Sequence, residues 1–253
     1  MTQEHIKTYF NKILPHYKAM AENPKVQKIN AKIPQSFFCT QWGESFDRGI
    51  LFVGRATNGW GTGIDPSSLL DDGIFNGSDQ MQWIDDVWFE NKDKKGNKLW
   101  TGNHSPFWRL IRRVTEHYHK ELWYSHIAWS NLAKCAPSAR GNPSNSLWYA
   151  TLEQNIELLK IDIEMLNPKI IVMITGGWEN EIIKSIVGET PCLKTESFGH
   201  TIKTWRVADR LIIACERPEG RPEDSLTKCI CAAINEFNLC FKKDDVPCKI
   251  YGG

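Results

Sequence analysis

Long hydrophobic runs are absent from the sequence, because no stretch approaches the roughly 18 consecutive apolar residues of a membrane-spanning helix. The first ten residues, MTQEHIKTYF, are too polar for a secretory signal. A large excess of charge is also missing, since the formal net charge is only +1. We therefore expect a cytoplasmic protein with no membrane partner, and any contact with nucleic acid would have to depend on a local basic face.

The cysteines and histidines also lack the spacing that is typical of metal ligands. The eight cysteines include no CxxC pair, and the closest two are Cys229 and Cys231. His117 and His119 are two residues apart on an expected helix and so point to different faces. The pattern predicts reduced, mostly buried thiols, no metal site and no cofactor.

Alternating apolar and amphipathic segments predict an α/β fold. The segments ILFVG (50–54) and KIIVMITG (169–176) are short, apolar and end in glycine, as buried parallel strands do. Further strands are expected near 125–130 and within 201–217. Helices are expected over 3–21 with an interruption at Pro15, 105–121, 146–166, and 221–237. This order predicts a three-layer α/β/α sandwich around a mostly parallel, roughly four-stranded central sheet.

In such sheets, sites form at the carboxyl ends of the strands. Four loops should therefore build one site: 54–60, 130–140, 176–178 and 215–221. Tryptophan is abundant, with 11 residues, and some of these side chains should line a groove while most pack in the core.

Two of these loops resemble a known family. ILFVGRATNG (50–59) resembles the first motif of the uracil-DNA glycosylase superfamily. The longer segment 129–176 is similar to a stretch of the superfamily's iron–sulfur branch, in which a base-reading Asn, a helix and a strand follow one another. The letters shared with that stretch are Asn131, Lys134, Cys135, Pro137, Arg140, Pro143, Leu166, Pro168, Lys169 and Gly176.

The resemblance covers about residues 48–236 and implies a domain organisation and an activity. It implies a glycosylase-like α/β domain over 48–240, followed by a tail over 241–253. The helical pattern of residues 3–21 predicts an N-terminal helical extension over 1–47 packed on the main domain, and binding to a partner is the alternative. Enzymes of this family flip a base out of DNA and hydrolyse its N-glycosidic bond. The implied partner is therefore single- or double-stranded DNA, or a nucleotide. The sequence does not indicate an oligomeric state.

The resemblance also implies roles for two base-binding residues. Asn131 matches the Asn that reads the base, and a side-chain amide offers the donor and acceptor that a uracil edge requires. Phe75, in GIFNG (73–77), resembles the Phe that stacks on the base, although a core position or a Trp as stacker are alternatives.

The two catalytic motifs depart from the family pattern. Arg55 occupies the position of the iron–sulfur branch's acidic residue, and a guanidinium cannot act as a general base. Asn58 or Asp65 could instead position water. In IACERPEGRP (213–222), Arg217 replaces a His and could stabilise charge on the leaving base. A salt bridge from Arg55 or Arg217 to a neighbouring acid is the alternative role.

The basic residues of these loops are suited to binding a phosphate or another anion. The expected anion-binding residues are Gly54, Arg55, Lys134 and Arg221. The iron–sulfur cluster itself is not expected. Cys135 is retained, but only Cys39 lies upstream and Thr151 stands where the last ligand would be, so too few thiolates remain to hold a cluster.

Three classes of function therefore stay open. The first is a divergent base-excision enzyme, and the second is a binding module of the same fold that does not hydrolyse its ligand. The third is a small-molecule enzyme, suggested only by the glycines at 54, 59, 61 and 63, which do not make a dinucleotide fingerprint. The lysine-rich run KDKKGNK (92–98) favours a solvated loop tip over a phosphate contact.

Overall fold

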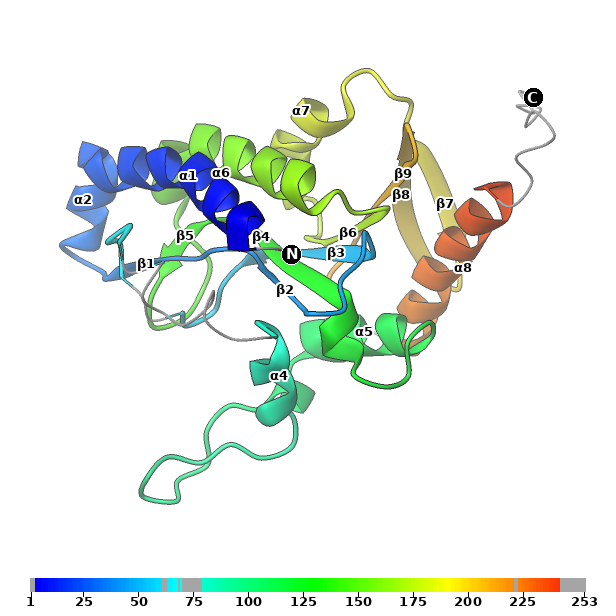
Figure 1. The fold of residues 1–253 in the computed structure, drawn as a ribbon, viewed down its shortest axis with the longest axis horizontal. Coiled ribbons are helices and arrows are strands. Elements are labelled where there is room, and N and C mark those ends of the chain that lie inside the picture. Colours follow the sequence, from blue (N-terminus) through cyan, green and yellow to red (C-terminus); the bar gives the residue numbers. More distant parts are fainter. Residues whose placement is uncertain (1–2, 61–62, 68, 70–78, 221–222, 242–253) are drawn as a thin grey trace.

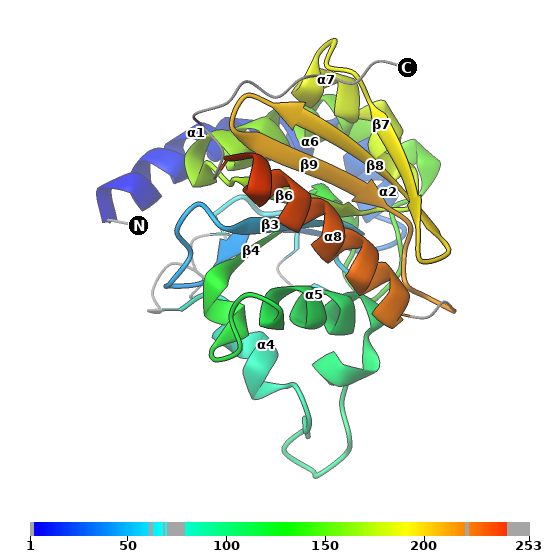
Figure 2. The same cartoon turned by 90° about the vertical axis from the view of Figure 1, so that its right-hand side faces the viewer.

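The structure is a computed structural model that describes residues 3–60, 63–67, 69, 79–220 and 223–241. Phe75 and Arg221, two of the residues singled out from the sequence, lie outside these ranges. The described chain forms a seven-stranded mixed sheet with helices on both faces, and a separate two-stranded ribbon (Figures 1 and 2).

The sheet has the strand order β2-β4-β3-β6-β9-β8-β7. Its four central strands, β4, β3, β6 and β9, run parallel, whereas β2 at one edge and β8 and β7 at the other are antiparallel to their neighbours. The strands are β2 (Gln41–Trp42), β3 (Ile50–Ala56), β4 (Ile127–Ala133), β6 (Ile170–Ile174), β7 (Leu193–Ser197), β8 (His200–Val207) and β9 (Arg210–Cys215).

The predicted α/β class is confirmed, but the sheet is larger than the predicted four mostly parallel strands. Three antiparallel strands extend it, so half of its pairings are antiparallel. The sequence of β7, LKTES, is exposed over most of its length and has no apolar run, so hydrophobic periodicity could not reveal it. The two-residue strand β2 is too short to leave a pattern.

Helices cover both faces of the sheet (Figures 1 and 2). One face packs against α1 (Gln3–Glu22), α2 (Pro24–Asn30), α6 (Asn145–Leu166) and α7 (Ile183–Val187). The other face packs against α4 (Gln82–Asp86), α5 (Pro106–Glu116) and α8 (Glu223–Phe241). Short 3-10 turns are η1 (Gly102–His104), η2 (Trp123–His126) and η3 (Trp178–Glu181), and the ribbon pairs β1 (Gln35–Phe37) with β5 (Cys135–Pro137).

Helices α5 and α6 have well-defined N-termini. Ser105 caps α5 by accepting a hydrogen bond from the Trp108 amide (3.4 Å), and Pro106 occupies the first turn. Ser144 caps α6 in the same way through the Leu147 amide (3.2 Å). These caps fix where each loop at the carboxyl edge of the sheet ends.

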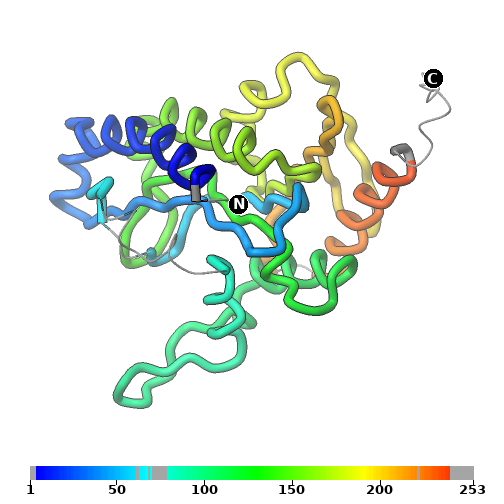
Figure 3. Tube along the Cα trace, viewed as in Figure 1, coloured from blue at the N-terminus to red at the C-terminus, as the bar shows by residue number. Residues whose placement is uncertain are grey.

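The N-terminal residues are joined to the rest of the fold. Helix α1 lies along α6 (Figures 1 and 3), and β2 is a strand of the sheet itself. The predicted interruption at Pro15 is wrong, because α1 continues through this residue. The buried residues Ile13, Tyr17 and Met20 on either side of it hold the helix against the core. Within the described ranges, no helix is long and apolar enough to span a bilayer.

Candidate functional site

A pocket of about 530 Å³ lies at the carboxyl edge of the parallel strands. Its volume falls within the roughly 300–1,000 Å³ typical of small-molecule sites. The lining residues come from the strand ends and following loops of β3, β4, β6 and β9, from α4, from the segment around the start of α5 and from the loop before α6. They are Gly54, Arg55, Ala56, Thr57, Asn58, Gly59, Trp60, Trp83, Trp100, His104, Ser105, Pro106, Phe107, Trp108, Trp129, Asn131, Gly141, Asn142, Ile174, Arg217 and Glu219.

The position of the pocket follows from the order of the strands. The chain leaving β3 leads to α4 and α5 on one face of the sheet, whereas the chain leaving β6 leads to α7 on the other face. Connections that diverge in this way open a crevice between adjacent parallel strands, which is the usual ligand site of an open α/β sheet. Of the four loops predicted to build one site, 54–60, 130–140 and 215–221 contribute lining residues, whereas 176–178 contributes none.

Asn131 lies in the wall of the pocket near the end of β4. Its side chain is 1% exposed, and its Nδ2 is buried without a hydrogen-bond partner among the described residues. Gly54, its register partner on β3, makes room for it, since a Cβ at Gly54 would lie 2.5 Å from Asn131 Oδ1 and 3.2 Å from the Phe107 ring. A buried amide donor with no partner costs free energy, so this arrangement points to an acceptor supplied by a ligand.

Four tryptophans form one wall of the pocket: Trp60, Trp83, Trp108 and Trp129. Their rings contact one another, with centroid separations of 4.9 Å between Trp108 and Trp129 and 5.8 Å between Trp60 and Trp83. The indole Nε1 atoms of Trp60 and Trp129 are buried and, like Asn131 Nδ2, have no acceptor among the described residues. The wall is therefore aromatic, and its buried polar atoms are donors.

Arg55 spans the gap between β3 and β6. Its Nε donates to the Thr175 carbonyl (2.5 Å), and its guanidinium lies over the Trp178 ring at 5.2 Å from the ring centroid. Gly176 has φ +58°, and a Cβ there would lie 2.7 Å from Arg55 Nη2. Burial and the nearby Arg217 lower the pKa of Arg55 from its ordinary value. Arg55 is thus held by backbone carbonyls, with no acidic partner in contact among the described hydrogen bonds.

Arg217, in the loop after β9, lies near Arg55, since a Cβ at Gly176 would be 2.7 Å from Arg55 Nη2 and 3.6 Å from Arg217 Cγ. It forms an ion pair with Glu219, which is the only carboxylate among the described residues that line the pocket. The alternative expected from the sequence, a salt bridge from Arg217 to a neighbouring acid, is therefore present. The other acid considered, Glu216, instead contacts His200 Nδ1 (2.5 Å).

The N-terminus of α5 adds positive potential to the same pocket. Ser105, Pro106 and Phe107 of its first turn line the wall, beside His104. The unpaired amides of a helix N-terminus carry a partial positive charge that favours anions. Together with the two arginines, this end of the helix makes the pocket suitable for a ligand that is negative or becomes negative.

Of the two residues predicted to position water, only Asn58 lines the pocket. Asn58 Oδ1 accepts a hydrogen bond from the Gly141 amide (2.7 Å), which ties the loop after β3 to the loop that precedes α6. Asp65 does not line the pocket. Its carboxylate accepts bonds from the backbone and the hydroxyl of Ser67, and these bonds lower its pKa.

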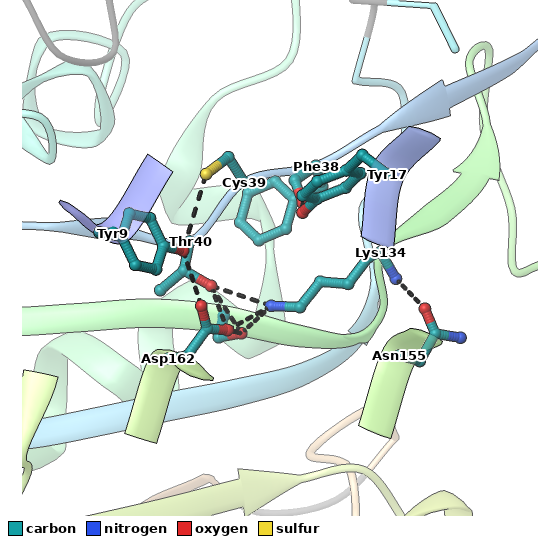
Figure 4. Close-up of polar contacts among 9 residues, drawn as sticks. Tyr9, Tyr17, Phe38, Cys39, Thr40, Lys134, Asn155 and Asp162 are labelled. Atoms are coloured by element: carbon teal, nitrogen blue, oxygen red, sulfur yellow. Dashed lines mark hydrogen bonds and ion pairs between the residues drawn. The ribbon is translucent and has the colours of Figure 1, made fainter. Parts of the chain in front are cut away.

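Lys134 directly follows β4 and does not line the pocket. Its side chain is 1% exposed, and its Nζ donates to Asp162 Oδ2 (2.6 Å), Thr40 Oγ1 (2.9 Å) and Ser130 Oγ (2.5 Å) (Figure 4). All three ammonium protons are therefore used inside the core. The predicted contact between Lys134 and an anion is not available in this structure, because the ion pair with Asp162 neutralises the charge.

The same buried cluster joins α1 to α6. Tyr9 donates to Asp162 Oδ1 (2.7 Å) and lies near Cys39 Sγ (3.7 Å) (Figure 4). Burial, followed by the charge of Asp162, raises the pKa of Cys39 to about 12, and burial alone raises that of Cys135 to about 12. These cysteines are thiols at neutral pH. Among the described residues, no three His, Cys, Asp or Glu side chains are grouped as metal ligands would be.

The pocket thus brings together Gly54, Arg55, Asn58, Asn131 and Arg217, and leaves out Asp65 and Lys134. The tryptophan wall and Phe107 were not assigned from the sequence. Trp60 directly follows Gly59, and Trp129 precedes Asn131 by two residues on the same face of β4, which is the signal that could have identified them.

No protein-family model matches this chain, and no curated protein matches it in sequence.

Proposed function

We propose that this protein is a uracil-DNA-glycosylase-like enzyme whose pocket receives a base extruded from DNA and hydrolyses its N-glycosidic bond. The observation that carries the proposal is the buried Asn131 amide, whose Nδ2 has no acceptor among the described residues that surround it. The parallel strands β4, β3, β6 and β9 would then form the centre of the α/β/α sandwich that the sequence resemblance implies.

The shape of the pocket supports a flat, aromatic ligand. A base could pack against the tryptophan wall while its polar edge meets Asn131, because an amide can donate to a carbonyl oxygen and accept from a ring N–H. Extrusion of a base costs a few kcal/mol, which such stacking and hydrogen bonding would have to recover. The lack of a side chain at Gly54 leaves room beside the strand for the Asn131 amide and the Phe107 ring, which would meet the base.

The charges of the pocket suit the departure of the base. In the proposed reaction the bond between the sugar C1′ and the base nitrogen breaks, and its electron pair leaves with the base. Arg217 and the N-terminus of α5 would stabilise this developing negative charge. Water adds to C1′ and releases a proton to solvent. Asn58 is the residue proposed to position that water, since Arg55 cannot accept a proton.

A second candidate is a protein that binds the base or nucleotide without hydrolysing it. One observation favours it: Glu219 is the only carboxylate among the described lining residues, and Arg217 already pairs with it. In that case Arg55 and Arg217 would hold a phosphate or another anion. We also propose a cytoplasmic location for either function, because the six cysteines with described side chains are all free thiols.

Hydrolysis can be tested with a panel of oligonucleotides. Single- and double-stranded DNA carrying uracil, hypoxanthine, xanthine or a mismatch would be incubated with the protein and then treated with alkali, which breaks the strand at an abasic site. We expect breaks at one or more altered bases, and a loss of at least about 100-fold in Asn131→Ala, as for removal of one catalytic hydrogen-bonding group.

Asn11→Ala provides a matched control, because it makes the same change on the exposed face of α1. Its rate should equal that of the unmodified protein. Breaks that persist in Asn131→Ala would exclude the proposed role of this residue. An absence of breaks on every substrate, together with retained binding of the same oligonucleotides, would replace the first candidate with the second.

A further inference from the structure

A hairpin projects from the molecule between α4 and η1 (Figures 1 and 2). We call residues 89–100 the arm. The arm is the segment that contains the lysine-rich run, for which the sequence favoured a solvated loop tip. Its structure, its charge and its position beside the pocket indicate a binding role for this segment.

Backbone and side-chain hydrogen bonds define the shape of the arm. The Leu99 amide donates to the Asn91 carbonyl (2.8 Å), and the Asp93 amide donates to the Asn97 carbonyl (3.0 Å). At the tip, Asp93 Oδ1 accepts from the amides of Lys95 and Asn97, both at 2.8 Å. The arm is therefore a hairpin with a hydrogen-bonded turn at its tip, and its lysines project from this hairpin.

The charge of the arm is positive and concentrated. It carries four lysines, Lys92, Lys94, Lys95 and Lys98, against two acidic residues, whereas the whole chain has a net charge of only +1. All four lysines are exposed. Glu90 is paired with Lys92 near the base, and Asp93 is engaged in the turn. The arm thus presents Lys94 and Lys95 at its tip, and Lys98 opposite Lys92, as a local basic face on a nearly neutral protein.

The base of the arm is continuous with the pocket. Trp100, its last residue, lines the pocket and is 47% exposed. Just beyond the arm, Gly102 packs so tightly against Trp88 that a Cβ there would lie 2.7 Å from the indole. Trp88 is itself buried against Trp123, with ring centroids 5.4 Å apart. The base is therefore anchored in the core, and the basic tip extends from the rim of the pocket.

We propose that the arm binds the sugar–phosphate backbone of a DNA strand, with Lys94, Lys95 and Lys98 on phosphates and Trp100 available to stack on a base at the rim of the pocket. Basic side chains beside an exposed aromatic ring are the combination by which proteins hold single strands without reading their sequence. The inference rests on the proposed function for its choice of DNA, but it does not depend on hydrolysis or on Asn131.

The test measures binding of an undamaged single-stranded DNA 20-mer by fluorescence anisotropy over a series of salt concentrations. The variant replaces Lys94, Lys95 and Lys98 with alanine. If each lysine neutralises one phosphate, the slope of log affinity against log salt becomes shallower by about 2, which lowers the affinity about 100-fold at ~0.1 M salt. The control variant replaces Lys25, Lys28 and Lys32, which are exposed lysines at α2, and should retain the slope of the unmodified protein.

Both triple variants remove the same charge, so an equal loss of slope in both would show a general charge effect and overturn the inference. An unchanged slope in the arm variant, or no salt-dependent binding by the unmodified protein, would overturn it too. The oligonucleotide carries no altered base, so these outcomes are independent of base recognition. Failure of the proposed function would appear instead as indifference of strand cleavage to Asn131→Ala. Thermal unfolding of the arm variant checks that the fold is intact.

Discussion

Asn131 lies on β4, and Lys134 follows three residues later, just beyond the end of this strand. The two side chains have opposite environments. Asn131 lines the pocket, and its Nδ2 has no hydrogen-bond acceptor among the described residues. Lys134 points towards α6, and its ammonium group donates three hydrogen bonds within the core. Successive side chains of a strand point to opposite faces, so residues three apart cannot share a site on one face. The family-like letters placed both residues in the site, whereas this alternation would have separated them. The prediction from the sequence was therefore right to place Asn131 in the pocket and wrong to place Lys134 there.

The buried ion pair leads to a prediction about stability. Replacing Asp162 with Asn leaves the Lys134 ammonium buried without a compensating charge. We expect the free energy of unfolding to fall by about 3–5 kcal/mol, as for removal of one partner of a buried pair. Urea denaturation measures it. The double variant Lys134→Met with Asp162→Leu removes both charges and should recover a large part of the loss. A double variant less stable than the single one would contradict this account.

At the scale of elements, the central strands and the long helices were predictable because their apolar patterns are long and regular. The strands β3 and β6 are buried over most of their length, and α6 has a Ser cap and ends at Asn167, which has φ +43°. The edge strands β2 and β7 were not predictable. The pairing of an edge strand depends on its neighbour's backbone rather than on its own apolar residues, and β7 has few of these.

Helix α1 provides a prediction at this scale. Pro15 lies inside the helix on its exposed side, where it removes a backbone donor without filling the core. Because a proline in a helix interior is unfavourable by about 3 kcal/mol relative to alanine, Pro15→Ala should stabilise the protein by about 1–3 kcal/mol. Chemical denaturation with fluorescence detection measures the change. Destabilisation by this substitution would mean that the proline ring makes contacts that the helix needs.

At the scale of the whole molecule, the pocket combines residues that are far apart in the sequence. Arg55, Trp83, Asn131 and Arg217 meet because β3, β4, β6 and β9 end at one edge of the sheet. The rule for open α/β sheets predicted this edge and three of these residues. It could not predict Trp83, because this residue comes from α4, in the long segment between β3 and α5, and not from the end of a strand.

The distribution of cysteines gives a prediction for the molecule as a whole. Burial raises the pKa of Cys39 and Cys135 to about 12, so both remain protonated at pH 8 and unreactive, because the thiolate is the nucleophile. Cys192 is exposed. Brief treatment with iodoacetamide at pH 8, followed by peptide mass spectrometry, should find Cys192 alkylated and the two buried cysteines unmodified. Early alkylation of Cys39 would show that α1 leaves the core more readily than its buried contacts suggest.

The most direct test of the central claim is a titration of the tryptophan wall with free uracil. Trp60, Trp83, Trp108 and Trp129 line the pocket, so a base that enters it should quench the intrinsic fluorescence. We predict saturable quenching in the unmodified protein, and a loss of affinity in Asn131→Ala of about tenfold or more, as for a lost hydrogen bond of about 1.5 kcal/mol or more. Asn11→Ala should titrate normally. Quenching of equal strength and affinity in Asn131→Ala, or none with uracil, hypoxanthine or xanthine in the unmodified protein, would contradict a base-binding pocket read by Asn131.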